Sequence, residues 1–227
     1  MSDRSQSAIW RTVQRTICVL LCLLAGCGCV QASGVVDRIV ATVNRHAIFQ
    51  SEWEEAVRFE ALMNGRPLKE ITPEQRKQTL ERLIDQELIE EQKLTSNYVP
   101  ATAAEVAARI HELRESVPAW RTDTGWNAAL AGYGLSEQDV MERTEVQLNL
   151  LRYIDLRFRP EIHVDHKTVE NYYVEQLVPE LHRSGTALVP LQQAAPKIEQ
   201  LLVERRLTDI QNHWVSGLRS QARIEVR

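Results

Sequence analysis

Residues 72–94 read TPEQRKQTLERLIDQELIEEQKL and carry the clearest helical pattern in the chain. Thr72 and Gln75 stand at the spacing of a helix start signal, with proline at the first helical position. Apolar side chains then recur at helical spacing, at Leu80, Leu83, Ile84, Leu88 and Leu94. The stretch therefore predicts an amphipathic helix that runs from residue 72 to about residue 95.

The segment before this helix predicts a strand and a shorter helix. Residues 35–43, VVDRIVATV, are β-branched and roughly alternating, and a turn is expected at residues 44–46. Ser51 and Glu54 have the spacing of a capping box, and the Asn-Gly pair at residues 64–65 supplies a left-handed stop. We expect a helix over residues 51–63, preceded by a strand with no partner nearby in the sequence.

The segment after residue 95 predicts a series of helices joined by short connections. Four residues have the chemistry of helix starts, namely Thr102, Asp123, Ser136 and Asp165. The helix that begins after Asp165 is expected to run to residue 181, and residues 182–190 form the clearest linker. A last helix is expected from Pro196 to about residue 220, followed by a short strand at residues 223–226.

Two strands at opposite ends of a helical chain need each other, because a lone strand cannot satisfy its backbone hydrogen-bonding groups. We therefore expect residues 36–43 to pair with residues 222–226. The predicted fold class is mostly α, with one small two-stranded antiparallel β element that joins the N- and C-terminal segments into one domain.

Composition and charge exclude several classes of protein. The chain has 227 residues, of which 44% are hydrophobic and 26% charged, an ordinary globular composition. Its net charge is −4, and it becomes −6 once the first 32 residues, with three arginines and one aspartate, are set aside. This acidic balance argues against a nucleic-acid partner and against adsorption of the domain to a membrane surface.

The N-terminus predicts an exported protein. Arg11 and Arg15 precede an apolar run too short to span a bilayer, and small residues follow it, as in a secretory signal peptide over residues 1–32. Cleavage after Ala32 would release a soluble chain. Cleavage before Cys27, in the lipobox-like Leu24-Ala25-Gly26-Cys27, would leave an acylated cysteine and a lipid anchor. Both alternatives stay open, and both place the rest of the chain outside the cytoplasm.

The sequence contains no recognisable catalytic or metal-binding constellation. Glu161, His163, Asp165 and His166 are the tightest group of ligand-type residues, but Pro160 and the helix start at Asp165 favour a polar helix start. No nucleophile elbow, zinc-protease motif or phosphate-binding glycine loop is present. We therefore expect no catalytic residue, no metal and no cofactor.

The aromatic residues are the remaining candidates for a binding function. Trp126, Tyr172, Tyr173 and Trp214 stand at apolar helical positions and are expected to pack in the core. Trp120 and Tyr133 stand among turn residues, where an exposed ring would be costly without a partner. They either contact a ligand or close the corner between two helices.

Several stretches, in order along the chain, resemble the N-terminal chaperone region of the SurA-like family of parvulin-type foldases. They are residues 36–44 (VDRIVATVN) with Ile48, residues 81–89 (ERLIDQELI), residues 134–136 (GLS), residues 156–159 (LRFR), residues 169–173 (VENYY), residues 196–202 (PKIEQLL) and residues 222–226 (ARIEV). The resemblance covers residues 35–227. It implies a helical chaperone domain over residues 33–181, completed by the C-terminal helix and strand at residues 191–227.

The chain departs from the family pattern in one respect. The family inserts one or two parvulin isomerase domains where this chain has only the linker at residues 182–190, and nine residues cannot form such a domain. The resemblance therefore implies a chaperone module without a prolyl isomerase, and no catalytic residue can be carried over.

The predicted function is an ATP-independent periplasmic chaperone for unfolded envelope clients, in particular outer-membrane proteins. Candidate client-binding residues are Phe59, Met63, Trp120 and Tyr133, because Met and aromatic side chains adapt to varied apolar partners. Two alternatives are a prolyl isomerase relative with residual activity and an assembly lipoprotein with one fixed partner. No nucleic acid is expected to bind, and a membrane is contacted only if Cys27 is acylated.

Overall fold

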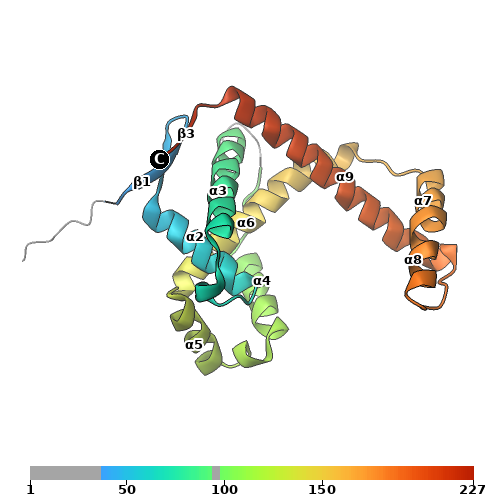
Figure 1. The fold of residues 1–227 in the computed structure, drawn as a ribbon, viewed down its shortest axis with the longest axis horizontal. Helices are drawn as coiled ribbons and strands as arrows, with labels where there is room; N and C mark the ends of the chain where they lie inside the picture. The colour runs from blue at the N-terminus through green and yellow to red at the C-terminus, as the bar shows by residue number, and fades with distance from the viewer. Residues whose placement is uncertain (1–36, 94–97) are drawn as a thin grey trace, which may run out of the picture. The chain divides into compact units, whose positions relative to one another are not determined.

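The computed structural model describes residues 37–93 and 98–227. The expected signal peptide, both cleavage positions and the lipidation candidate Cys27 lie outside the described residues, as do residues 35 and 36 of the expected first strand. The described part is largely helical and carries one small antiparallel sheet, which confirms the predicted fold class in its main features (Figure 1).

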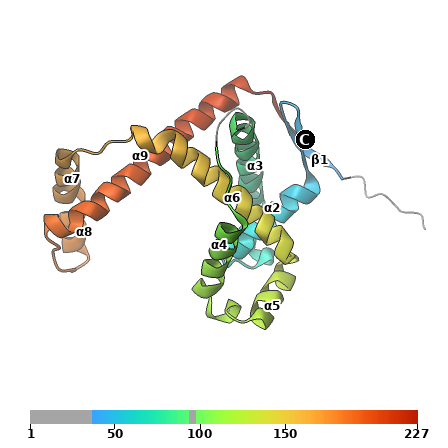
Figure 2. The same ribbon diagram turned by 180° about the vertical axis from the view of Figure 1, so that it is seen from behind.

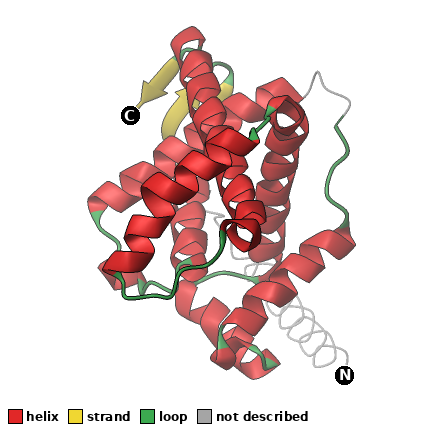
Figure 3. Ribbon diagram, turned by 90° about the vertical axis from the view of Figure 1, so that its right-hand side faces the viewer, coloured by secondary structure: helices red, strands yellow, loops and turns green. Residues whose placement is uncertain are grey.

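The sheet joins the two ends of the described chain, as predicted, but it has three strands and not two. Strand β1 (Ile39–Val43) lies between β2 (His46–Phe49) and β3 (Ile224–Val226). The β1–β3 pairing aligns Ala41 with Val226 and Val43 with Ile224, at the end of the chain shown in Figure 3. The expectation that β1 has no neighbouring strand was wrong, because Asn44 adopts a φ of 52° in a tight turn that returns β2 alongside β1.

Asn44 also links this turn to the C-terminal strand and to a helix. Its backbone N–H donates to the carbonyl of Arg223 at 2.8 Å, and its side-chain oxygen accepts from the Arg223 N–H at 2.9 Å. Its side-chain nitrogen donates to Glu91 at 2.8 Å. One short polar side chain therefore holds together three segments that are far apart in the sequence.

The first helices follow the sequence prediction except at one cap. Helix α2 (Gln50–Met63) continues directly from β2, and it ends at Asn64, before Gly65 with its positive φ of 61°. Ser51 does not form the expected capping box, because its N–H and hydroxyl both donate to the carboxylate of Asp37. Helix α3 (Pro73–Lys93) begins as predicted, with reciprocal hydrogen bonds between Thr72 and Gln75.

Helices α4 (Ala103–Ser116), α5 (Asp123–Tyr133) and α6 (Glu137–Phe158) also begin where the sequence indicated. Thr102 and Ser136 both form capping boxes. The cap of α5 is Thr122 and not the predicted Asp123, which is already the first helical residue. Gly134 ends α5 in the left-handed conformation, with a φ of 65°, so the chain can turn directly into α6.

The C-terminal third differs more from the prediction. The helix after Asp165 is divided into α7 (His166–Tyr172), a π-helical turn (Tyr173–Leu177) and α8 (Val178–Arg183). Helix α9 (Leu191–Gln221) begins five residues before the predicted start and contains Pro196 in its interior. The helix continues through this proline because Ala194 and Ile198, on either side of it, are buried against Val169 of α7.

The described residues form four apolar clusters. The first lies among α2, α4, α5 and α6, and includes Phe59, Val106, Trp126 and Val140. The second joins the sheet to α2 and α3, the third joins α3, α6 and α9, and the fourth lies between α7 and α9. Helix α9 contributes to the last three clusters, and it runs from α7 and α8 at one end to the sheet at the other (Figures 1 and 2).

Candidate functional site

Two of the four predicted client-binding residues are core residues. Phe59 is 2% exposed and Trp120 is 9% exposed, both in the first apolar cluster. The Trp120 ring lies edge-on to Trp126, with 5.9 Å between the ring centroids, and the Trp120 carbonyl accepts from Arg114. Trp120 therefore closes a helix corner, which was the alternative to ligand contact.

The other two predicted residues are half-buried against the same cluster. Tyr133 ends α5, and Met63 ends α2. Met63 also lines a small hollow of about 50 Å³, together with Leu113 of α4 and with Leu148 and Leu151 of α6. The structure therefore brings Met63 to a surface depression, while client binding by any of the four residues stays a prediction.

A larger groove lies between α6 and α9. Its volume is about 650 Å³, and α6 contributes Leu148, Leu151 and Leu156 to its lining. Leu151 is 63% exposed and Leu156 is 60% exposed. The facing side comes from Leu207, Thr208 and Gln211 of α9. Large exposed apolar side chains beside a groove are typical of a binding surface.

A third hollow, of about 320 Å³, lies among α2, α3, α6 and α9 and reaches inward to Phe59. It shares Gln147 with the Met63 hollow and Gln211 with the α6–α9 groove, and those two share Leu148 and Leu151. The three hollows are therefore contiguous around residues 147–151 of α6. The Met63 hollow and the α6–α9 groove are both mainly apolar and share Leu148 and Leu151, and we call them together the α6 groove. We call the third hollow the inner cleft.

The charged groups that line the α6 groove are all in ion pairs. Arg159 contacts Asp155 at 2.5 Å and Glu204 of α9 at 2.9 Å, and so bridges the two walls. Arg109 pairs with Glu112 at 3.0 Å, and Arg152 pairs with Glu105. Because each of these charges has a partner, the groove presents leucine side chains and compensated charge to a ligand.

Glu105 is also the partner of Thr102 in the capping box of α4. Its carboxylate accepts from the Thr102 N–H at 2.7 Å and from the Thr102 hydroxyl at 2.9 Å. These two hydrogen bonds, followed by the contact with Arg152, lower the pKa of Glu105 to about 2. Arg152 in turn donates to the carbonyl of Pro100 at 2.9 Å, so the groove wall on α6 is tied to the start of α4.

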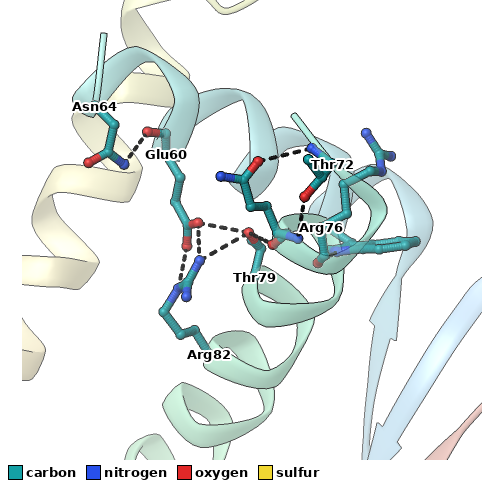
Figure 4. Close-up of polar contacts among 8 residues, drawn as sticks. Glu60, Asn64, Thr72, Arg76, Thr79 and Arg82 are labelled. Carbon is teal, nitrogen blue, oxygen red and sulfur yellow. Dashed lines mark hydrogen bonds and ion pairs between the residues drawn. The ribbon is translucent and has the colours of Figure 1, made fainter. Parts of the chain in front are cut away.

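A polar network separates the inner cleft from a fourth hollow on the other side. Glu60 of α2 accepts from Arg82 of α3 at 2.8 Å and from the buried Thr79 hydroxyl at 2.7 Å (Figure 4). These three residues line both the inner cleft and an adjoining hollow of about 260 Å³. The network therefore joins α2 to α3 at the boundary between the two spaces.

A fifth hollow, of about 360 Å³, lies between the π-helical turn and α9. Tyr172, Leu177 and Leu181 line one side of it, and Ile198 and Leu201 line the other. The hydroxyl of Tyr173 donates to the carbonyl of Val189 at 2.8 Å, which joins the loop before α9 to the π-helical turn. This hollow shares no lining residue with the α6 groove.

The described residues contain no cluster of His, Cys, Asp and Glu able to hold a metal ion. In the group around Glu161, the ring nitrogen of His163 lies 3.3 Å from the carbonyl oxygen of Glu161, and His166 lies 3.2 Å from the carboxylate of Glu170. Within the same residues, no helix combines the length and the apolarity needed to cross a membrane.

The exposed leucines of the α6 groove were not among the binding residues predicted from the sequence. The segment 148–156 contains Leu148, Leu150, Leu151 and Leu156 together with Ile154. A helix that buries one face needs only about three to four apolar residues in two turns, and this segment has more. The additional apolar residues were the feature of the sequence that could have predicted an exposed apolar surface on this helix.

Comparison with known proteins places the chain in a family. The SurA-like N-terminal domain family matches residues 1–152, which is two thirds of the chain and extends from the N-terminus into α6. A search of the curated proteins finds no match. The family match agrees with the helical architecture and with the resemblance seen in the sequence, and on this evidence the chain belongs to the SurA-like N-terminal domain family.

Proposed function

We propose that this protein is an ATP-independent chaperone of the periplasm that holds unfolded segments of envelope proteins in the α6 groove. The observation that carries the proposal is the pair of exposed leucines, Leu151 and Leu156, beside a continuous groove in a member of this family. Reversible contact with apolar surface requires no nucleotide. The signal peptide expected over residues 1–32 supports an exported location, with a lipid anchor if Cys27 is acylated.

The length of the groove sets the size of the segment that it can hold. Its lining along α6 and its C-cap runs from Thr144 to Arg159, fifteen residue steps that correspond to about 23 Å along a helix. An extended chain covers that distance with roughly seven residues. The groove therefore suits a short extended segment, such as one strand of an unfolded outer-membrane protein.

The compensated charges of the groove indicate the kind of segment that it selects. Arg109, Arg152 and Arg159 each have a carboxylate partner, so a client gains little from carrying a charge of its own. Apolar contact is not screened by salt, whereas attraction between exposed charges is. We expect client binding to change little with ionic strength.

Aggregation of a denatured outer-membrane β-barrel protein, followed by light scattering without nucleotide, tests the proposal. Replacement of Leu151 and Leu156 together by serine should weaken suppression several-fold, because it removes two exposed apolar side chains from the groove. The free energy of unfolding should stay nearly the same, since exposed substitutions cost within about 0.5 kcal/mol.

Val174 provides the matched control, because it is 64% exposed and lies on the π-helical turn, away from α6. V174S should suppress aggregation as well as the wild-type protein does. Equal suppression by the leucine double variant would contradict the proposed groove. A pull-down that returned one folded partner in stoichiometric amount would support the assembly-lipoprotein alternative instead.

A further inference from the structure

The inner cleft differs from the α6 groove in the polar groups that line it. Its charged side chains already have partners: Glu60 pairs with Arg82, Asp85 with Arg219 at 2.5 Å, and Arg143 with Glu55 at 2.8 Å. A charged ligand would therefore meet no free opposite charge among the residues that line this cleft.

Four carboxamide side chains line the same cleft, from three helices. They are Gln86 of α3, Gln147 of α6, and Gln211 and Asn212 of α9. None of the four makes a hydrogen bond to another residue within the described part of the chain. The uncharged hydrogen-bonding capacity of the cleft is therefore available to a ligand or to water.

The floor between these carboxamides is apolar. Phe59, Leu83 and Ile89 are buried side chains that reach the cleft from α2 and α3, and Leu150 reaches it from α6. A purely apolar ligand would strip water from the four carboxamides without replacing its hydrogen bonds, which is unfavourable. The ligand that fits is neutral and offers both donors and acceptors beside apolar groups.

A peptide main chain has this chemistry. Each peptide unit presents one N–H donor and one carbonyl acceptor, and each carboxamide side chain presents two donors and an acceptor. We propose that the inner cleft binds the main chain of an extended client segment through Gln86, Gln147, Gln211 and Asn212. The main chain is the same for every sequence, so the contacts would hold clients of different side-chain composition.

The position of the cleft agrees with this role. Gln147 stands where the cleft meets the Met63 hollow, and Gln211 stands where it meets the α6–α9 groove. A client whose side chains occupy the groove would therefore have its main chain next to carboxamides. The inference rests on the proposed function, since it assigns the client contacts of the same surface.

The test uses residues 33–227, the chain expected after cleavage behind Ala32, and two fluorescently labelled heptapeptides. One is acetyl-Leu-Ser-Leu-Ser-Leu-Ser-Leu-amide, and the other has N-methylserine at its three serines, which removes three main-chain donors and keeps the side chains. Fluorescence anisotropy gives the Kd of each. The wild-type protein should bind the first peptide about tenfold more tightly, as expected for the loss of one or two hydrogen bonds.

The double variant Gln86→Leu and Gln147→Leu should bind the two peptides with nearly equal Kd. The ratio of the two Kd values depends on hydrogen bonds from the carboxamides, whereas apolar contact is the same for both peptides. Gln86→Asn with Gln147→Asn keeps the amide groups and should retain part of the preference. Gln200→Leu is the matched control, since Gln200 is exposed on α9 outside the cleft and its loss should leave the ratio unchanged.

The outcomes separate this inference from the proposed function. Equal binding of both peptides by the wild-type protein, or an unchanged preference in the leucine double variant, would overturn main-chain recognition. In either case, weaker binding after replacement of Leu151 and Leu156 by serine would leave the chaperone groove standing. If the wild-type protein bound neither peptide, both proposals would fall.

Discussion

Replacement of Trp120 by alanine should destabilise the protein strongly, because the ring is a core residue. Trp120 and Trp126 are 9% and 2% exposed and lie edge-to-face, with an interplanar angle of 62°. Truncation of a buried tryptophan to alanine costs about 3–5 kcal/mol, through lost apolar burial and the cavity that remains. For a domain of this size, this corresponds to a decrease in Tm of roughly 6–20 °C.

The effects of W120A and W126A on the free energy of unfolding should also be coupled, because the two rings are in contact. Edge-to-face pairs contribute about 0.5–1.5 kcal/mol beyond their burial, so the loss in the double variant should fall short of the sum of the single losses by about that amount. The Nε1 group of Trp126 has no hydrogen-bond partner in the described residues, so no hydrogen bond is lost with its ring. The measurement is a double-mutant cycle from urea denaturation followed by circular dichroism.

All four proteins of the cycle should be compared in the same sucrose buffer, because sucrose raises the free energy of unfolding of each protein. V174A is the control, since an exposed valine should cost less than about 0.5 kcal/mol. A loss below about 1 kcal/mol for W120A would refute the assignment of Trp120 to the core. That result would restore the ring as a candidate client contact.

Three further predictions concern the C-terminal segment, prolyl isomerase activity and the carboxyl group of Glu87. Deletion of residues 190–227 should abolish the cooperative unfolding transition in calorimetry, because α9 contributes to three apolar clusters and β3 pairs with β1. A retained transition would show that the fold does not require this segment. Residues 33–227 should leave the exchange rate of an X-Pro peptide unchanged in a protease-coupled assay, since uncatalysed exchange takes tens of seconds and a saturable acceleration would be obvious. Burial raises the pKa of Glu87, and the nearby His46 lowers it to a smaller extent. The contribution of Glu87 to the free energy of unfolding should therefore be largest below its unfolded pKa of about 4.3 and be lost as the pH rises through its higher folded pKa. The stability advantage of wild type over E87Q in urea unfolding should accordingly decrease as the pH rises above about 4.3. A pH-independent difference would show that Glu87 has the same proton affinity in both states.

Local chemistry in the sequence determined most of the helices. Thr72, Thr102 and Ser136 form caps with the residue three positions later, and such contacts depend on neighbours along the chain. Gly134 ends α5 for a local reason as well, since glycine accepts a positive φ without strain. The pairing of the terminal strands was also predictable, because unpaired strands have few alternatives in a helical chain.

Contacts between distant segments decided the features that the sequence did not reveal. Asp37 takes the role at the start of α2 that the sequence assigned to Ser51, and Asn44 adds β2 to the sheet. The start of α9 at Leu191, with Pro196 inside the helix, depends on packing against α7.

The candidate site belongs mostly to this second group. The sequence identified apolar and aromatic residues near the site, among them Phe59, which lines the inner cleft, and Met63, which lines the Met63 hollow. It could not tell that Trp120 is buried or that Leu151 is exposed. Hydrophobic periodicity predicts which face of a helix is apolar, but exposure depends on whether another helix covers that face. Only the packing of α6 against α4 and α9 decided that, and with it the position of the groove.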